Sequence, residues 1–72
     1  MKVKMGKNYM TNSGELVLQI LHVDRVDTEY PVVAEMENGD VHTYTSEGVI
    51  YIGYENHPLN LIEIPEWEEE LK

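Results

Sequence analysis

The chain has 72 residues, one domain's length and close to the lower limit for independent folding. It has no cysteine, which excludes disulfides and a thiolate metal site. Fourteen acidic residues against five basic ones give a formal net charge of −9, and Arg25 is the only cation between Glu15 and Glu70. A chain this acidic repels nucleic acid and attracts basic partners, although solubility alone would also explain the charge.

No apolar run approaches the roughly 20 residues of a membrane-spanning helix. The basic start, Met-Lys-Val-Lys-Met, lacks the apolar core of a signal peptide. We therefore expect a soluble cytoplasmic protein that does not contact a membrane. Because so short a chain without disulfides has a small core, a compact monomer and a homodimer are both open.

The first half of the chain predicts two strands. Residues 1–10 alternate loosely between apolar and polar side chains and fit a strand with a bend at residues 6–8. A turn is expected at 11–14. Residues 15–23 are the most apolar segment, and we expect a strand that is buried on both faces. A helix that starts at Ser13 is the alternative, because the helical and the strand periodicity both leave apolar residues on both faces of this segment.

After a polar connector, Pro31 begins the next strand and Asn38-Gly39 predicts a hairpin with a two-residue type I′ turn. In that register Glu37 pairs with Asp40, and Glu35 pairs with His42. Side chains alternate along a strand, so the hairpin acquires one apolar and one acidic face. The apolar face holds Val32, Ala34, Met36 and Val41. The outer face holds Glu35, Glu37, Asp40 and His42, together with Val33 and Tyr44.

The remaining segments continue the same pattern. Residues 46–48 predict a turn, 49–54 a further strand, and 59–64 a last short strand. Pro65 and the acidic residues after it favour a helical turn over 65–72. Residues 1–64 are thus expected to form a single β domain, and 65–72 an acidic C-terminal helical turn or tail.

Nothing in the sequence indicates catalysis. His22, His42 and His57 stand on separate elements without metal-ligand spacing, and no glycine-rich phosphate loop is present. We expect a non-enzymatic protein with no metal and no cofactor. The five tyrosines and Trp67 could stack on bases, but no cationic groove accompanies them, so direct nucleic-acid binding is not expected. The tyrosines are expected to fill the small core.

The order of features resembles the small SH3-like barrels, including Tudor and KOW-type domains, and also short phage-encoded proteins. The resemblance runs through Met-Gly-Lys-Asn-Tyr at 5–9, Gly14, Tyr-Pro-Val-Val at 30–33 and Tyr-Thr-Ser-Glu-Gly at 44–48, and it covers most of residues 3–64. Five or six short strands with turns every eight to twelve residues predict a mostly β fold, a small antiparallel barrel or sandwich, with the short C-terminal helical turn after it. The resemblance implies that this fold is a five- to six-stranded antiparallel SH3-like barrel. It transfers no catalytic residue.

The acidic residues suggest a protein-binding module that imitates DNA. Carboxylates on alternate strand residues repeat at about 7 Å, the same order as the distance between successive phosphates. Three acidic patches are predicted. The first is Glu35, Glu37 and Asp40; the second is Asp24, Asp27 and Glu29; the third is Glu63, Glu66, Glu68, Glu69 and Glu70. The resemblance to phage DNA mimics implies a basic nucleic-acid-binding partner, such as a nucleoid protein, a polymerase or a defence enzyme in the bacterial host cytoplasm.

Two other functions remain open. The chain could be a structural or adaptor barrel whose acidity serves only solubility. Its partner contacts would then be apolar, through Val33 and Tyr44 or through Tyr51, Tyr54, Trp67 and Leu71. Sequestration of a small anionic nucleotide is disfavoured, because the chain has few cations to complement such a ligand.

Overall fold

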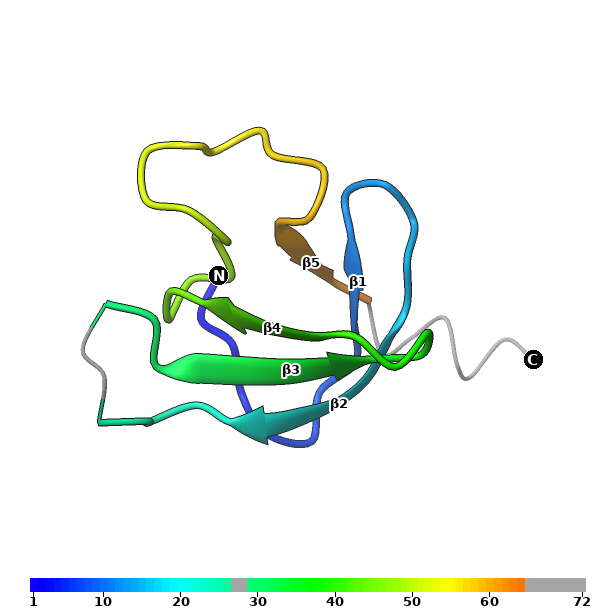
Figure 1. Cartoon of the computed structure of the whole chain (residues 1–72), viewed down its shortest axis with the longest axis horizontal. Coiled ribbons are helices and arrows are strands. Elements are labelled where there is room, and N and C mark those ends of the chain that lie inside the picture. Colours follow the sequence, from blue (N-terminus) through cyan, green and yellow to red (C-terminus); the bar gives the residue numbers. More distant parts are fainter. Residues whose placement is uncertain (27–28, 65–72) are drawn as a thin grey trace.

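The computed structural model describes residues 1–26 and 29–64 and shows a small, mostly β protein (Figure 1). Its strands are β1 (Tyr9–Thr11), β2 (Val17–His22), β3 (Val32–Met36), β4 (Val41–Tyr44) and β5 (Leu61–Glu63). They form two antiparallel sheets, β1–β5 and β2–β3–β4. The prediction of a mostly β fold is confirmed. The helical turn predicted over 65–72 lies outside the described residues.

All five strands contribute side chains to one hydrophobic core. The buried cluster consists of Val3, Tyr9, Ile20, Val32, Ala34, Met36, Tyr44, Ile50 and Leu61. The two sheets are linked where Met10 of β1 forms an isolated antiparallel bridge with Leu16, just before β2. Removal of this apolar surface from water is the main force that holds the two sheets together. In the described part of the chain, no helix has the length and hydropathy needed to cross a membrane.

The β3–β4 hairpin forms as predicted, but its register differs by one residue. The pairs are Val32 with Tyr44, Val33 with Thr43, Ala34 with His42, and Glu35 with Val41. The amide of Met36 donates to the carbonyl of Asp40 at 2.8 Å, and the amide of Gly39 donates to the carbonyl of Met36 at 3.0 Å. Among the loop residues 37–39, only Gly39 has a positive φ, 95°, so the connection is a three-residue loop with a glycine bulge and not a type I′ turn.

This shift of one residue moves every side chain of β4 to the other face of the sheet. Tyr44 is fully buried in the core, whereas Val41 is 55% exposed. The predicted outward position of Tyr44 and core position of Val41 are therefore wrong. The predicted pairing of Glu35 with His42 is also wrong, because His42 stands opposite Ala34. The predicted outer face shared by Glu35, Asp40 and His42 is wrong for the same reason: Asp40 pairs with Met36, so Asp40 and His42 lie on the other face from Glu35. Val33 is buried as well, although it lies outside the main core cluster.

Residues 15–23 do contain a strand, β2, but the prediction that both faces are buried is wrong. Ile20 is its only buried residue, and Leu18 is 57% exposed. The pairing with β3 shifts register twice, between Val17 and Gln19 and again between Ile20 and His22. These irregularities disturb the strict alternation of the strand, so side chains on both sides of Ile20 turn towards solvent.

Residues 49–54 form a loop and not the predicted strand. The buried side chain of Asn60 takes the place of a strand partner: its Oδ1 accepts the amide of Ile50 at 2.9 Å, and its Nδ2 donates to the carbonyl of Tyr54 at 2.8 Å. The predicted turn at 46–48 is confirmed, and the last strand is confirmed as β5. The expected first strand is shorter than residues 1–10 suggested, because only Tyr9–Thr11 is regular.

Candidate functional site

The tip of the β3–β4 hairpin is organised by the side chain of Asn38. Its Oδ1 accepts the amide of Asp40 at 2.9 Å. Its Nδ2 donates to the Asp40 carboxylate at 3.2 Å and to the Glu15 carboxylate at 2.7 Å. An amide group has two N–H donors, so it can serve both acceptors at once. Asn38 thereby holds two carboxylates from distant parts of the chain beside each other.

Glu15 reaches this tip because the β1–β2 loop is itself well anchored. The amide of Glu15 donates to Oγ1 of the fully buried Thr11 at 3.0 Å, and its carbonyl accepts the amide of Thr11 at 2.8 Å. The amide of Glu37 then donates to the carbonyl of Leu16 at 3.2 Å. Backbone and side-chain hydrogen bonds therefore join the loop to the hairpin and fix where the acidic residues stand.

Glu35 is held in a similar way on the outer face of the sheet. Nε2 of Gln19, its cross-strand neighbour on β2, donates to the Glu35 carboxylate at 2.8 Å. We call Glu15, Glu35, Glu37 and Asp40 the hairpin acidic surface. In the observed register Asp40 pairs with Met36 and Glu35 pairs with Val41, so their side chains leave the hairpin on opposite faces and the surface wraps around its end. Three of its carboxylates accept hydrogen bonds from neutral amides. A hydrogen bond from a neutral amide orients a carboxylate but brings no positive charge to it. The negative charge can therefore still attract a cationic partner.

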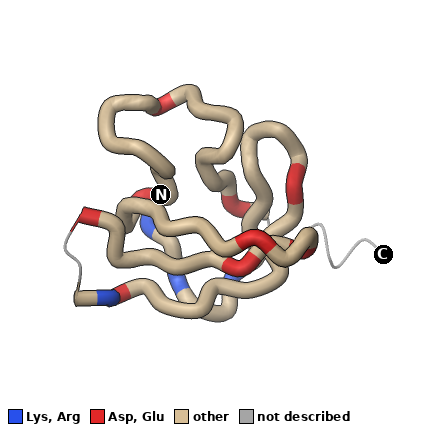
Figure 2. The backbone as a smooth tube through the Cα atoms, viewed as in Figure 1, with Lys and Arg blue, Asp and Glu red and all other residues tan. Residues whose placement is uncertain are grey.

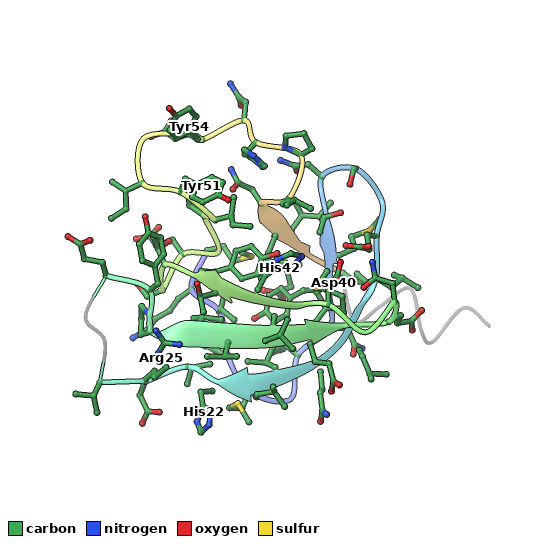
Figure 3. The ribbon with its side chains drawn as sticks, viewed as in Figure 1. His22, Arg25, Asp40, His42, Tyr51 and Tyr54 are labelled. Carbon is green, nitrogen blue, oxygen red and sulfur yellow. The ribbon has the colours of Figure 1, made fainter. Side chains whose placement is uncertain are left out.

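The second predicted patch lies at the other end of the molecule. Asp24 and Glu29 are exposed on the loop between β2 and β3, opposite the end that carries the Asn38 turn (Figures 1 and 2). Figure 3 shows the same separation, with Arg25 at one end of the sheet and Asp40 at the other. Asp27 lies outside the described residues. The structure therefore does not bring the first two predicted patches together.

Of the third predicted patch, the structure describes Glu63, which is exposed on β5 opposite Tyr9. Glu66, Glu68, Glu69, Glu70 and Trp67 lie outside the described residues. Glu15, by contrast, was missed by sequence reasoning, because its position beside Asp40 depends on a contact between segments 23 residues apart. Its only sequence signal is the Thr-Asn-Ser-Gly turn that precedes it.

His42 and His57 pack against tyrosine rings, and His22 is exposed on β2. His57 Nδ1 accepts the amide of Leu59 at 3.1 Å, and its ring packs edge-on against Tyr51 at 5.3 Å. The ring of His42 packs edge-on against Tyr44 at 6.3 Å. Within residues 1–26 and 29–64, no group of three histidine or acidic side chains has the arrangement needed to hold a metal ion.

Tyr44 shows how far the charge of the hairpin acidic surface extends. Its hydroxyl is buried and has no hydrogen-bond partner among the residues that the structure describes. Burial, and secondly the negative charge of Glu15, raise the pKa of Tyr44 to about 12. The surface is thus electrostatically coupled to the core beneath it.

Comparisons with protein-family models, with curated proteins and with solved structures found no match to this chain. The functional inference therefore rests on the residues of the chain itself.

Proposed function

We propose that this chain is a non-enzymatic acidic module that binds a basic nucleic-acid-binding protein in place of DNA. The observation that carries the proposal is the hairpin acidic surface. Its four carboxylates come from two segments, and three of them accept hydrogen bonds from neutral amides. A basic DNA-binding surface would meet this fixed array as it meets phosphates, and would release its counterions likewise.

Two physical features favour such a role. Fixed carboxylates lose little conformational freedom on binding, so more of the electrostatic attraction is retained as affinity. The net charge of −9 also adds a long-range field that speeds encounter with a basic partner at low ionic strength. By its resemblance to phage DNA mimics, the module would act on a nucleoid protein, a polymerase or a defence enzyme in the cytoplasm of a bacterial host.

The scaffold for this surface is proposed to be an SH3-like barrel. Two observations support the assignment. β2, β3 and β4 form a consecutive antiparallel sheet, and β1 contacts both β5, through a ladder, and β2, through the Met10–Leu16 bridge. Through these contacts β1 connects the two sheets, and both sheets pack around the same core, as the strands of a small barrel do.

The proposal is tested by capture from a bacterial lysate with a salt titration and DNA competition. The test variant is Glu35→Gln/Glu37→Gln/Asp40→Asn. Its matched control, Asp24→Asn/Asp27→Asn/Glu29→Gln, removes the same charge from the segment of the chain between β2 and β3. The wild type and the control should retain a basic DNA-binding protein that duplex DNA displaces, and the hairpin variant should lose it. Capture of no such protein by the wild type would refute the proposal.

A second candidate function is an adaptor that binds through apolar residues. It is favoured by exposed side chains on the loop between β4 and β5: Tyr51, Ile52 and Tyr54 are 52%, 56% and 64% exposed. The rings of Tyr51 and Tyr54 lie 6.2 Å apart and edge-on. In the same capture experiment, Tyr51→Ala/Tyr54→Ala or Trp67→Ala should abolish binding if this function is correct, and neutralisation of the hairpin should leave binding intact.

A further inference from the structure

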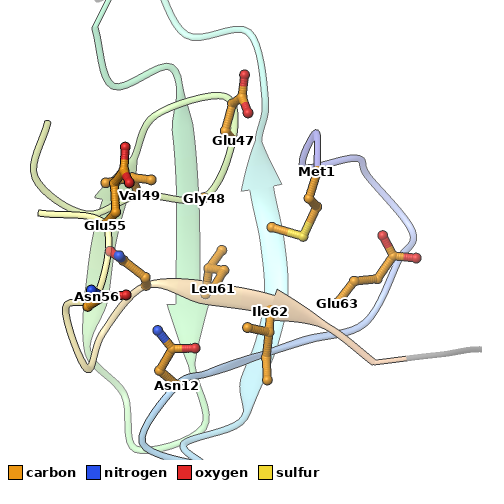
Figure 4. Close-up of a pocket in the computed structure, with 11 residues that line it drawn as sticks. Met1, Asn12, Glu47, Gly48, Val49, Glu55, Asn56, Leu61, Ile62 and Glu63 are labelled. Carbon is orange, nitrogen blue, oxygen red and sulfur yellow. The ribbon is translucent and has the colours of Figure 1, made fainter. Parts of the chain in front are cut away.

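A groove of about 480 Å³ lies beside β5 (Figure 4). Gly48, Asn60 and Leu61 are buried at its base, and Val49 and Ile62 add apolar surface. Met1, Asn12 and Asn56 complete the uncharged side chains of the lining. Three carboxylates stand around it, and each comes from a different segment. They are Glu47 from the turn after β4, Glu55 from the following loop and Glu63 from β5.

The floor of this groove is held rigidly. Gly48 has a φ of 86°, and a Cβ at this position would lie 3.1 Å from Cβ of Leu61. The carbonyl of Gly48 accepts the amide of Leu61 at 2.8 Å. Asn60, next in the chain, ties β5 to the loop that carries Glu55 through its bonds to Ile50 and Tyr54. The groove is therefore formed before any partner arrives, which lowers the entropy lost on binding.

The lining selects one kind of occupant. An apolar floor with an acidic rim suits a side chain that has an aliphatic stem and a cationic head. The carboxylates would repel a phosphate or an acidic peptide. No metal-binding group of three acidic or histidine side chains occurs among the described residues, so a bare metal ion is a poor fit. Arginine suits carboxylates on several sides better than lysine does, because its guanidinium presents five N–H donors in a planar fork.

We propose that this groove receives one arginine side chain of the basic partner. The inference rests on the proposed function and adds a specific anchor to it. The hairpin acidic surface would attract the basic partner, and the groove would fix where one arginine of that partner binds. A buried arginine in a preformed pocket is a common anchor of protein interfaces. The groove would then decide which basic proteins the module binds, since charge alone selects poorly among them.

The direct test is an NMR titration with the capped peptide Gly-Gly-Arg-Gly-Gly. Two control peptides of the same length carry lysine or norleucine in place of arginine. Saturable shifts are expected at the amides of Val49, Asn60 and Ile62, strongest with arginine and absent with norleucine. Equal shifts with norleucine, or shifts only at the Asn38 turn, would overturn the inference.

Two triple variants make the result specific. Glu47→Gln/Glu55→Gln/Glu63→Gln should weaken arginine-peptide binding about tenfold, the combined effect expected from three exposed ion pairs. Glu35→Gln/Glu37→Gln/Asp40→Asn removes the same charge and should change it less than twofold. Circular dichroism confirms that both variants fold.

The lysate capture separates this inference from the proposed function. If the wild type captures no basic protein, the proposed function fails. If the wild type captures one and the groove variant holds it equally tightly, only the arginine groove fails. Loss of capture by the groove variant supports both.

Discussion

Replacement of Tyr44 by phenylalanine should stabilise the protein. The Tyr44 hydroxyl is buried, and within residues 1–26 and 29–64 it has no hydrogen-bond partner. An unsatisfied buried polar group costs roughly 1–3 kcal/mol. Tyr44→Phe removes that group and keeps the ring, so we expect a gain of about 1 kcal/mol. For a urea slope near 1 kcal/mol/M, the unfolding midpoint should rise by about 1 M.

Tyr9→Phe is the matched control. Tyr9 is equally buried, but its hydroxyl accepts the amide of Lys4 at 2.8 Å. Loss of this bond should destabilise the protein by about 1 kcal/mol, so the two substitutions should shift the midpoint in opposite directions. Both are measured by circular dichroism in urea at one protein concentration, because a homodimer would make the midpoint depend on concentration. Destabilisation by Tyr44→Phe would show that its hydroxyl is paired, and would refute the reasoning.

The same variant predicts a difference at high pH. The pKa of Tyr44 is raised from 10.0 to about 12 in the folded protein, so folding favours the neutral hydroxyl. This contribution is fully present below pH 10 and is lost as the pH rises towards 12. Wild-type stability should therefore fall more steeply than that of Tyr44→Phe across this window in parallel urea titrations. Parallel curves for the two proteins would contradict the assigned shift.

Further substitutions test the loop geometry and the one-sided burial of β2. Gly39→Ala should cost about 1–2 kcal/mol from its positive φ alone, since a Cβ there meets nothing within 4 Å. Gly48→Ala should cost clearly more, because its Cβ also meets Leu61 at 3.1 Å; equal losses in urea unfolding would contradict that contact. Ile20→Ala should cost about 2–5 kcal/mol, whereas Leu18→Ala should change stability by less than about 0.5 kcal/mol. Equal effects of these two on thermal unfolding would mean that β2 is buried on both faces.

The hairpin shows what the sequence can and cannot predict. Asn38-Gly39 correctly placed the turn, but it did not determine the length of the loop. The Asn38 side chain accepts the Asp40 amide, and the backbone of Asn38 keeps a negative φ. Of the two turn residues, only Gly39 therefore takes the left-handed conformation. The resulting register buries Tyr44 and exposes Val41. Burial of the larger aromatic side chain removes more apolar area from water, and that preference depends on the whole core.

The candidate sites depended still more on long-range contacts. The sequence predicted Glu35 and Asp40 near one turn, but it placed them on one face, and the one-residue register shift puts them on opposite faces. Glu15 joins them only through the folded β1–β2 loop. Glu47 and Glu55 stand together at one groove because Asn60 and Gly48 tie β5 to the loop before it. No local spacing predicts such a contact.

The central claim is that fixed carboxylates at the hairpin replace DNA on a basic protein. Its most direct measurement is displacement of labelled duplex DNA from the captured partner by increasing amounts of this protein. We expect full displacement by the wild type, with an affinity that falls steeply as salt rises, and at least tenfold weaker displacement by Glu35→Gln/Glu37→Gln/Asp40→Asn. If the partner binds this protein and DNA simultaneously, or if the neutralised variant displaces DNA as well as the wild type does, the claim is contradicted.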